Sequence, residues 1–155
     1  MDYLLDTNIL VIYSRKDDLA RRMEEELQLL IPDNRLAVST VTLGELDSLA
    51  KQLNFGRRRI DRLNVLLDRM AVASIEVDGL IPLYGIIDAF SQGQVDTEVH
   101  AGVPSARNMG KNDVWIATCA SYYDMTLVTT DKDFAHLEDE FIKLRYVDRA
   151  KYKSL

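Results

Sequence analysis

Apolar segments of two kinds alternate along the chain: short ones rich in aliphatic and β-branched residues, and longer ones with apolar positions at helical spacing. Short apolar segments between turn residues are typical of buried strands, and apolar positions three or four apart mark one face of a helix. Their alternation predicts βαβ units and a mainly parallel sheet. Strands are expected at residues 3–5, 36–40, 72–77, 126–129 and, at an edge, 141–145; helices are expected at residues 18–30, 42–53, 57–70, 80–90 and 112–123.

The helical and strand patterns are both lost between Ser91 and Lys111, where Gly and Pro recur. Connections of this length without regular structure are uncommon in compact domains and are often functional. The chain contains no repeat and no sign of a domain boundary, so we expect one α/β domain over residues 1–155.

Composition narrows the class of protein. With 47% hydrophobic and 28% charged residues, the chain resembles an ordinary globular protein and not a disordered one. Its one cysteine, Cys119, excludes an internal disulfide and lies in a predicted helix, where a buried thiol is expected. No signal-peptide pattern and no apolar run of about 20 residues is present, so we expect a cytoplasmic protein without a membrane span.

The charge pattern leaves two readings open for the basic residues. A net charge of −6 argues against nucleic-acid binding by the molecule as a whole, since phosphate contacts come from Lys and Arg. Positive charge is nevertheless concentrated in Arg57, Arg58, Arg59 and Arg62. These residues, with Lys111, are candidates for an RNA-binding surface; the alternative is a solvated helix face.

Four acidic residues stand where a hydrophobic segment meets a turn or a helix start: Asp6, Glu45, Asp113 and Asp131. Asp6 and Asp131 follow predicted strands, whereas Glu45 and Asp113 lie near the starts of helices. The carboxyl ends of parallel strands meet at one edge of a sheet, where ligands bind. We therefore expect the four carboxylates to face one rim.

Each of these residues also has a purely structural reading. The alternatives are helix capping by Asp6 or Asn8, a capping box of Thr42 and Glu45, an N-cap at Asn112 or Asp113, and a turn shaped by Asp131 and Asp133. When the four carboxylates are considered together, these structural explanations are less favoured. Like charges about 4 Å apart repel by about 4 kcal/mol at an effective dielectric of 20. A cluster at one rim requires a cation.

The ligand types indicate which cation. Carboxylates without accompanying His or Cys favour Mg²⁺ or Mn²⁺, and His100 and His136 are not spaced as a ligand pair. Such an ion activates water for attack on phosphorus, which points to phosphodiester hydrolysis. Candidates to orient the carboxylates or water are Thr7, Asn8, Thr40, Thr129 and Thr130. Asp133 is a further acid beside the last motif, but Asp131 lies nearer the strand end and is preferred as the metal ligand.

The four acidic motifs, in this order, resemble those of PIN-domain ribonucleases, and most closely the VapC-type toxins of toxin–antitoxin pairs. The matching segments are residues 4–10, 39–46, 112–118 and 127–134. The resemblance implies a three-layer α/β/α sandwich and a Mg²⁺- or Mn²⁺-dependent endoribonuclease with Asp6, Glu45, Asp113 and Asp131 in its catalytic site. It also implies a homodimer and inhibition by a cognate antitoxin that enters the acidic groove.

Two other classes fit part of the pattern. A PIN-like fold can serve only as an interaction module, but its usual mark is loss of an acidic residue, and none is lost here. Receiver domains also place acids at strand ends and bind Mg²⁺, and Asp78 is the sole loose candidate for their phospho-acceptor. The motifs encode neither the RNA target nor its cleavage sequence, which depend on surface shape.

Overall fold

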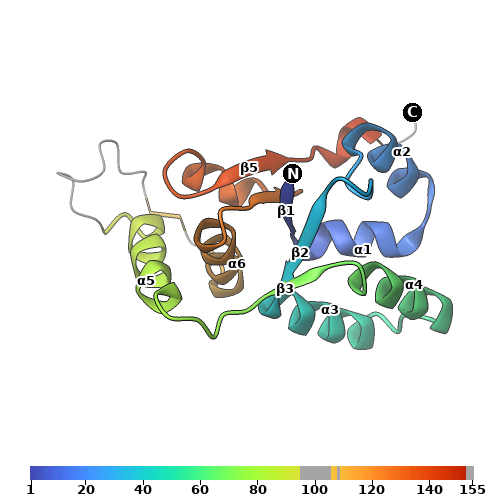
Figure 1. Ribbon diagram of the computed structural model, residues 1–155, viewed down its shortest axis with the longest axis horizontal. Helices are drawn as coiled ribbons and strands as arrows, with labels where there is room; N and C mark the ends of the chain where they lie inside the picture. The colour runs from blue at the N-terminus through green and yellow to red at the C-terminus, as the bar shows by residue number, and fades with distance from the viewer. Residues whose placement is uncertain (95–105, 108, 153–155) are drawn as a thin grey trace.

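A five-stranded parallel sheet forms the centre of the molecule (Figure 1). The computed structural model describes residues 1–94, 106–107 and 109–152. The strands are β1 (Asp2–Leu5), β2 (Arg35–Ser39), β3 (Ala71–Ala73), β4 (Thr126–Thr129) and β5 (Lys143–Tyr146), in the order β3-β2-β1-β4-β5. The expected parallel sheet is confirmed, with β5 at an edge as predicted.

Helices cover both faces of the sheet. On one side lie α1 (Thr7–Arg15), α2 (Asp18–Leu27), α3 (Thr40–Gln52) and α4 (Arg57–Leu67); on the other lie α5 (Leu80–Ser91) and α6 (Lys111–Tyr122). Alternate residues of a strand enter different cores: Tyr3 and Leu5 pack on the α1 side and Leu4 on the α6 side. The three-layer α/β/α sandwich is therefore confirmed. None of the described helices is both long and apolar enough to cross a membrane.

The structure differs from the predicted elements at several places. The helix α1 was not expected, and neither were the short 3-10 helices η1 (Lys132–Leu137) and η2 (Arg149–Tyr152). Strand β3 is shorter than predicted because the chain leaves the sheet at Ser74, whose carbonyl accepts a hydrogen bond from the Tyr123 hydroxyl at 2.9 Å. Most of the long connection, residues 95–105 and 108, lies outside the described residues.

The C-terminal end of α1 is held by arginines of α4. Arg59 donates from Nε to Ser14 Oγ at 3.0 Å, and its guanidinium lies 3.4 Å from the centroid of the Phe55 ring. Arg62 donates from Nε to the Ser14 carbonyl at 2.9 Å. Positive groups at a helix C-terminus are favourable, because the last carbonyls have no partner within the helix. Two of the four clustered arginines thus position α1, whose first residues belong to the acidic rim.

Candidate functional site

The four predicted carboxylates meet in one pocket at the carboxyl edge of the sheet. The pocket has a volume of about 570 Å³ and is lined by Asp6, Thr7, Asn8, Val41, Gly44, Glu45, Ser48, Leu49, Gln52, Asn112, Asp113 and Asp131. It lies beyond the ends of β1 and β4, where the order of the strands reverses from β1-β2-β3 to β4-β5. Such reversal points are the usual ligand sites of open α/β sheets.

Asp6 is the most buried of the four, with 4% of its surface exposed. It follows β1 and caps α1, accepting a hydrogen bond from the Thr7 backbone N–H at 2.7 Å. Its other oxygen accepts from the Thr129 hydroxyl at 2.6 Å. The capping alternative is therefore correct for Asp6, and the same carboxylate lines the pocket.

Glu45 lies on α3 and has both carboxylate oxygens engaged. Oε2 accepts from the Thr7 hydroxyl of α1, and Oε1 accepts from the Asn112 amide of α6 at 2.9 Å. The capping-box alternative for Glu45 is wrong, because Ser39 is the N-cap of α3, its hydroxyl accepting from the Thr42 N–H at 3.0 Å. Glu45 is thus free of any capping role and joins three helices at the rim.

Asp113 lies in the first turn of α6. The alternative that Asn112 or Asp113 is the N-cap of this helix is wrong. The N-cap is Gly110, and a Cβ added there would lie 3.2 Å from Asp113 Oδ2. That spacing is tighter than ordinary van der Waals contact. A side chain at position 110 would therefore require the Asp113 carboxylate to shift by a few tenths of an ångström.

Asp131 sits two residues beyond β4 and shapes the start of η1. Its backbone N–H donates to Thr129 Oγ1 at 3.0 Å, and its own Oδ1 accepts from the Asp133 N–H at 2.9 Å. Thr129 therefore links Asp6 to Asp131, as expected of an orienting residue. Asp131 lines the pocket, whereas Asp133 and Thr130 do not.

Burial and mutual repulsion raise the pKa of two of the carboxyls. Burial, followed by the negative charges of Glu45 and Asp131, raises the pKa of Asp6 to about 6 against the lowering effect of its two hydrogen bonds. Burial and the charges of Asp6, Asp131, Glu45 and Asp133 raise the pKa of Asp113 to about 7. No Lys or Arg is among the described residues that line the pocket, so none of them neutralises this acidity.

The donor set suits a hard divalent cation in its chemistry, because it consists of carboxylates and neutral oxygens. Over the described ranges, however, no group of three or more His, Cys, Asp or Glu side chains is arranged to hold a metal ion. Mg²⁺ commonly keeps several waters and takes only one or two protein carboxylates directly. A cation in this pocket would therefore be held directly by at most two of these carboxylates, with water between it and the others.

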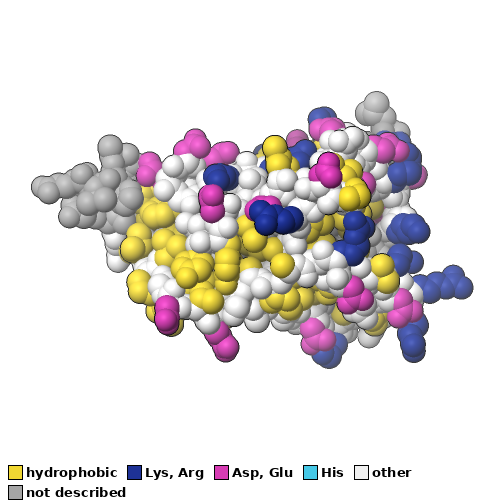
Figure 2. All heavy atoms as spheres, viewed as in Figure 1, with side chains coloured by type: hydrophobic (Ala, Val, Ile, Leu, Met, Phe, Trp, Pro, Cys, Tyr) yellow, Lys and Arg dark blue, Asp and Glu magenta, His cyan; other side chains and the backbone are white. Residues whose placement is uncertain are grey.

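The predicted basic residues lie outside this pocket. Lys111 pairs with Asp88 of α5, with Nζ 2.8 Å from Oδ2, and Arg57 pairs with Asp61 at 3.6 Å. Arg58 has no hydrogen bond or ion pair with any residue that the structure describes. Figure 2 shows Lys and Arg gathered at the end of the molecule where α2 and α4 lie, opposite α5.

Sequence reasoning missed two polar residues of the pocket, Ser48 and Gln52. It considered a third, Asn112, only as a helix cap. The α3 residues could have been found, since positions 45, 48, 49 and 52 share one face of a helix. Asn112 lies 67 residues from its partner Glu45, so no local pattern reveals their hydrogen bond.

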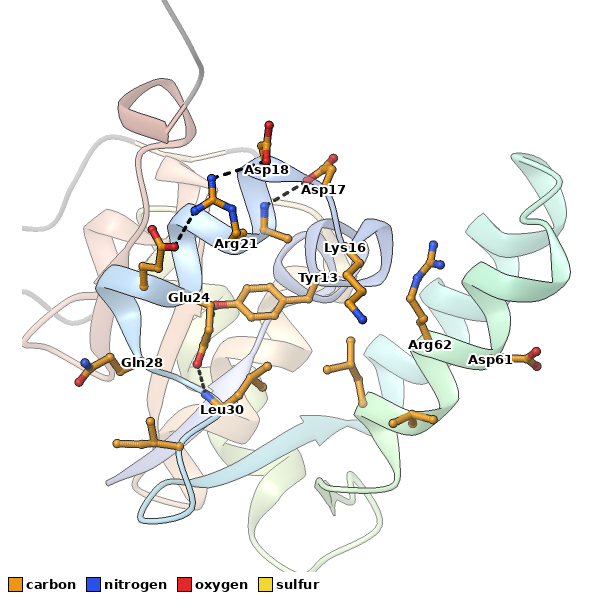
Figure 3. Close-up of a pocket in the computed structure, with 15 residues that line it drawn as sticks. Tyr13, Lys16, Asp17, Asp18, Arg21, Glu24, Gln28, Leu30, Asp61 and Arg62 are labelled. Atoms are coloured by element: carbon orange, nitrogen blue, oxygen red, sulfur yellow. Dashed lines mark hydrogen bonds and ion pairs between the residues drawn. The ribbon is translucent and has the colours of Figure 1, made fainter.

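A second and larger cavity, of about 910 Å³, lies between α1, α2 and α4 (Figure 3). Its central polar group, Glu24, already accepts hydrogen bonds from the Tyr13 hydroxyl at 2.8 Å and the Leu30 N–H at 2.9 Å. Arg21 at its rim is paired with Asp18 and Glu25. With these charges paired and its lining largely apolar, the cavity is suited to docking and not to chemistry.

The raised pKa values predict how stability depends on pH without a cation. A carboxyl whose folded pKa exceeds its unfolded value, near 3.8, contributes stability that is complete below that value and is lost as pH rises through the folded pKa. Asp113→Asn should therefore gain stability relative to the wild type between about pH 4 and pH 8. Urea unfolding in EDTA across this range measures the difference, with Asp68→Asn, at the exposed C-cap of α4, as the control. A wild-type-minus-variant difference that is independent of pH would contradict the prediction.

Comparisons with known proteins agree with this architecture. A model of the PIN domain family matches residues 3–140.

Three VapBC structures are among the solved structures that are similar to this chain. VapBC2 from Rickettsia felis, bound to a promoter DNA fragment, has 24% identity, a TM-score of 0.70 and coverage of 96% of this chain and 100% of that one. VapBC-1 from nontypeable Haemophilus influenzae has 26% identity, a TM-score of 0.67 and coverage of 94% and 98%. VapBC-5 from Mycobacterium tuberculosis, a member of the VapBC family of toxin–antitoxin systems, has 23% identity, a TM-score of 0.62 and the same coverage. No curated protein sequence matches the chain. The chain belongs to the PIN domain family.

Proposed function

We propose that this single domain is a Mg²⁺- or Mn²⁺-dependent endoribonuclease of the cytoplasm, and the VapC-type toxin of a toxin–antitoxin pair. PIN domains are nucleases, which supports phosphodiester hydrolysis in general. The observation that carries the proposal is the pocket in which Asp6, Glu45, Asp113 and Asp131 meet with no cationic side chain among its described lining.

The proposed metal ligands are Asp6, Glu45, Asp113 and Asp131, each directly or through water, with Asp131 preferred over Asp133. Burial and repulsion raise the pKa of Asp6 and Asp113, and a cation would relieve that repulsion. A bound divalent cation would compensate the carboxylate charge and polarise the phosphodiester and the attacking water. Thr129 holds the buried Asp6 in one orientation by its 2.6 Å hydrogen bond, so part of the site is already ordered.

A non-catalytic interaction module is the second candidate. The observation in its favour is that, in the described parts of the chain, no three acidic or histidine side chains form a ready-made metal site. The receiver-like alternative has less support, because Asp78 is not among the residues that line the acidic pocket. Metal binding and nuclease activity separate the two main candidates.

We predict that Mn²⁺ both stabilises the protein and supports RNA cleavage. At 100 times its dissociation constant, Mn²⁺ should add about 2.7 kcal/mol to the free energy of unfolding, because it binds the folded state. Asp113→Asn should remove turnover while RNA binding persists. The measurements are thermal melts and cleavage of a labelled RNA, each in Mn²⁺ and in EDTA. Coincident melts, with no metal-dependent cleavage, would leave the interaction module as the better reading.

We further propose that Arg57 and Arg58 bind RNA phosphates. Arg59 and Arg62 already position α1, and Lys111 is paired, whereas Arg58 is exposed and Arg57 has only a surface ion pair of small value. Each phosphate contact contributes about −0.7 to the salt slope for single strands.

Replacing Arg57 and Arg58 with Ala should therefore raise the Michaelis constant for RNA and flatten its salt dependence, with the turnover number unchanged. Arg62→Ala is the matched comparison, and it should instead lower the free energy of unfolding by about 1 kcal/mol through its lost hydrogen bonds. A salt series of cleavage rates and urea unfolding measure the two effects. An unchanged salt slope in the double variant would show that these arginines do not bind RNA and belong to a solvated helix face.

A cognate antitoxin is the proposed protein partner, supported by the toxin–antitoxin complexes among the similar structures. Its tail is expected to enter the acidic pocket. The apolar cavity between α1, α2 and α4 (Figure 3), where Val65 and Ile31 are exposed, would be a suitable groove for an amphipathic helix of the same partner. The test is the adjacent reading frame: its product should bind this chain and suppress its activity. A neighbouring gene whose product does not bind would argue against the pair.

We also propose a homodimer through α5. Two large apolar side chains of α5 face solvent: Ile86 is 49% exposed and Ile81 is 69% exposed, whereas Ile87 is buried. Figure 2 shows hydrophobic side chains gathered over this end of the molecule. Light scattering should give twice the chain mass of 17.7 kDa, and Ile86→Glu should return it to one chain, with Val65→Glu on α4 as control. A wild type of single-chain mass at micromolar concentration would exclude a stable dimer.

A further inference from the structure

Glu45 is held by two donors that come from different helices and stand next in sequence to other acids of the pocket. Thr7, which follows Asp6, donates its hydroxyl to Oε2. Asn112, which precedes Asp113, donates its amide to Oε1 at 2.9 Å. The position of Glu45 is therefore tied at one oxygen to the Asp6 side of the pocket and at the other to the Asp113 side.

The Asn112 side chain has no evident role in folding. It is exposed, the N-cap of α6 is Gly110, and the hydrogen bond to Glu45 is the sole one that its side chain makes with the described residues. An exposed hydrogen bond of this kind adds little to stability, because water replaces it at small cost. Asn112 nevertheless lines the acidic pocket. A residue there that does not serve the fold is explained best by a role in the site.

We propose that Asn112 is a positioning residue that, with Thr7, holds the Glu45 carboxylate at a fixed place opposite Asp6 and Asp113. This inference rests on the proposed function. With both oxygens held by donors, Glu45 stays at the rim despite repulsion from the other carboxylates. The spacing of the acidic groups, and with it the affinity for a divalent cation, then depends on a neutral amide that is not itself a ligand. Removal of a residue that hydrogen-bonds to a metal ligand commonly weakens metal affinity by about 10- to 100-fold.

The test is calorimetric titration of the full chain with Mn²⁺ in the absence of RNA. Asn112→Ala should raise the dissociation constant for Mn²⁺ on the order of 10-fold, without moving the melting temperature in EDTA. Gln52→Ala is the matched control, because Gln52 is a polar, exposed residue of the same pocket whose amide binds Ser48 and no carboxylate. Its Mn²⁺ affinity should equal that of the wild type.

A second measurement distinguishes positioning from a direct part in the reaction. RNA cleavage by Asn112→Ala should return to near the wild-type turnover number at saturating Mn²⁺, because its defect lies in affinity for the ion. In a double-mutant cycle, Asn112→Ala should have little further effect on Mn²⁺ affinity once Glu45→Gln is present.

The outcomes separate this inference from the proposed function. Wild-type protein that binds no Mn²⁺ would overturn both. If the wild type binds Mn²⁺ and Asn112→Ala binds it with the same affinity, the role of Asn112 alone is overturned. The same conclusion follows if the effects of Asn112→Ala and Glu45→Gln on Mn²⁺ affinity simply add. A melting temperature that falls in EDTA together with the affinity would make Asn112 a structural residue and would also overturn it.

Discussion

The buried carboxylate of Asp6 is the constraint on which both the fold and the site depend. A polar group removed from water is costly unless it is hydrogen-bonded. Asp6 meets this requirement with the Thr129 hydroxyl at the end of β4 and the first N–H of α1. Those two bonds bring the ends of the adjacent strands β1 and β4 and the start of α1 to one point. The acidic edge is therefore assembled by the same contacts that make burial of its first carboxylate tolerable.

The charges of Arg59 and Arg62 are kept away from this edge by the direction of α1. Arg59 and Arg62 bind the carbonyl end of α1, whereas Asp6 caps its N-terminal end. A nine-residue helix is about 13 Å long, which exceeds the screening length of about 8 Å at physiological salt. The arginines can therefore stabilise the helix without neutralising the pocket. Burial first, and then repulsion among the carboxylates, raises the pKa of Asp6 and of Asp113.

The features that follow from sequence periodicity were predictable, and those that depend on distant contacts were not. The alternation of apolar segments predicted the parallel sheet, including β4 at its observed bounds, and the ends of its strands predicted where Asp6 and Asp131 would meet. Helix α1 was missed because it is buried on most sides, so its apolar residues do not mark a single face. The structural role of Arg59 and Arg62 was hidden for a different reason: their partners lie 45 to 48 residues away.

Protons and divalent cations relieve the same repulsion in this pocket, and they must therefore compete. Protonation removes a negative charge from Asp6 or Asp113, whose pKa values lie near 6 and 7, and the proposed cation would compensate the same charges. Cation affinity should accordingly weaken as pH falls through this range. Glu45 accepts hydrogen bonds from Thr7 and Asn112, which would hold it in place during that exchange. Without a bound cation, repulsion among the ionised carboxylates lowers the stability of the folded protein. A divalent cation that relieves this repulsion would therefore bind more favourably than water alone.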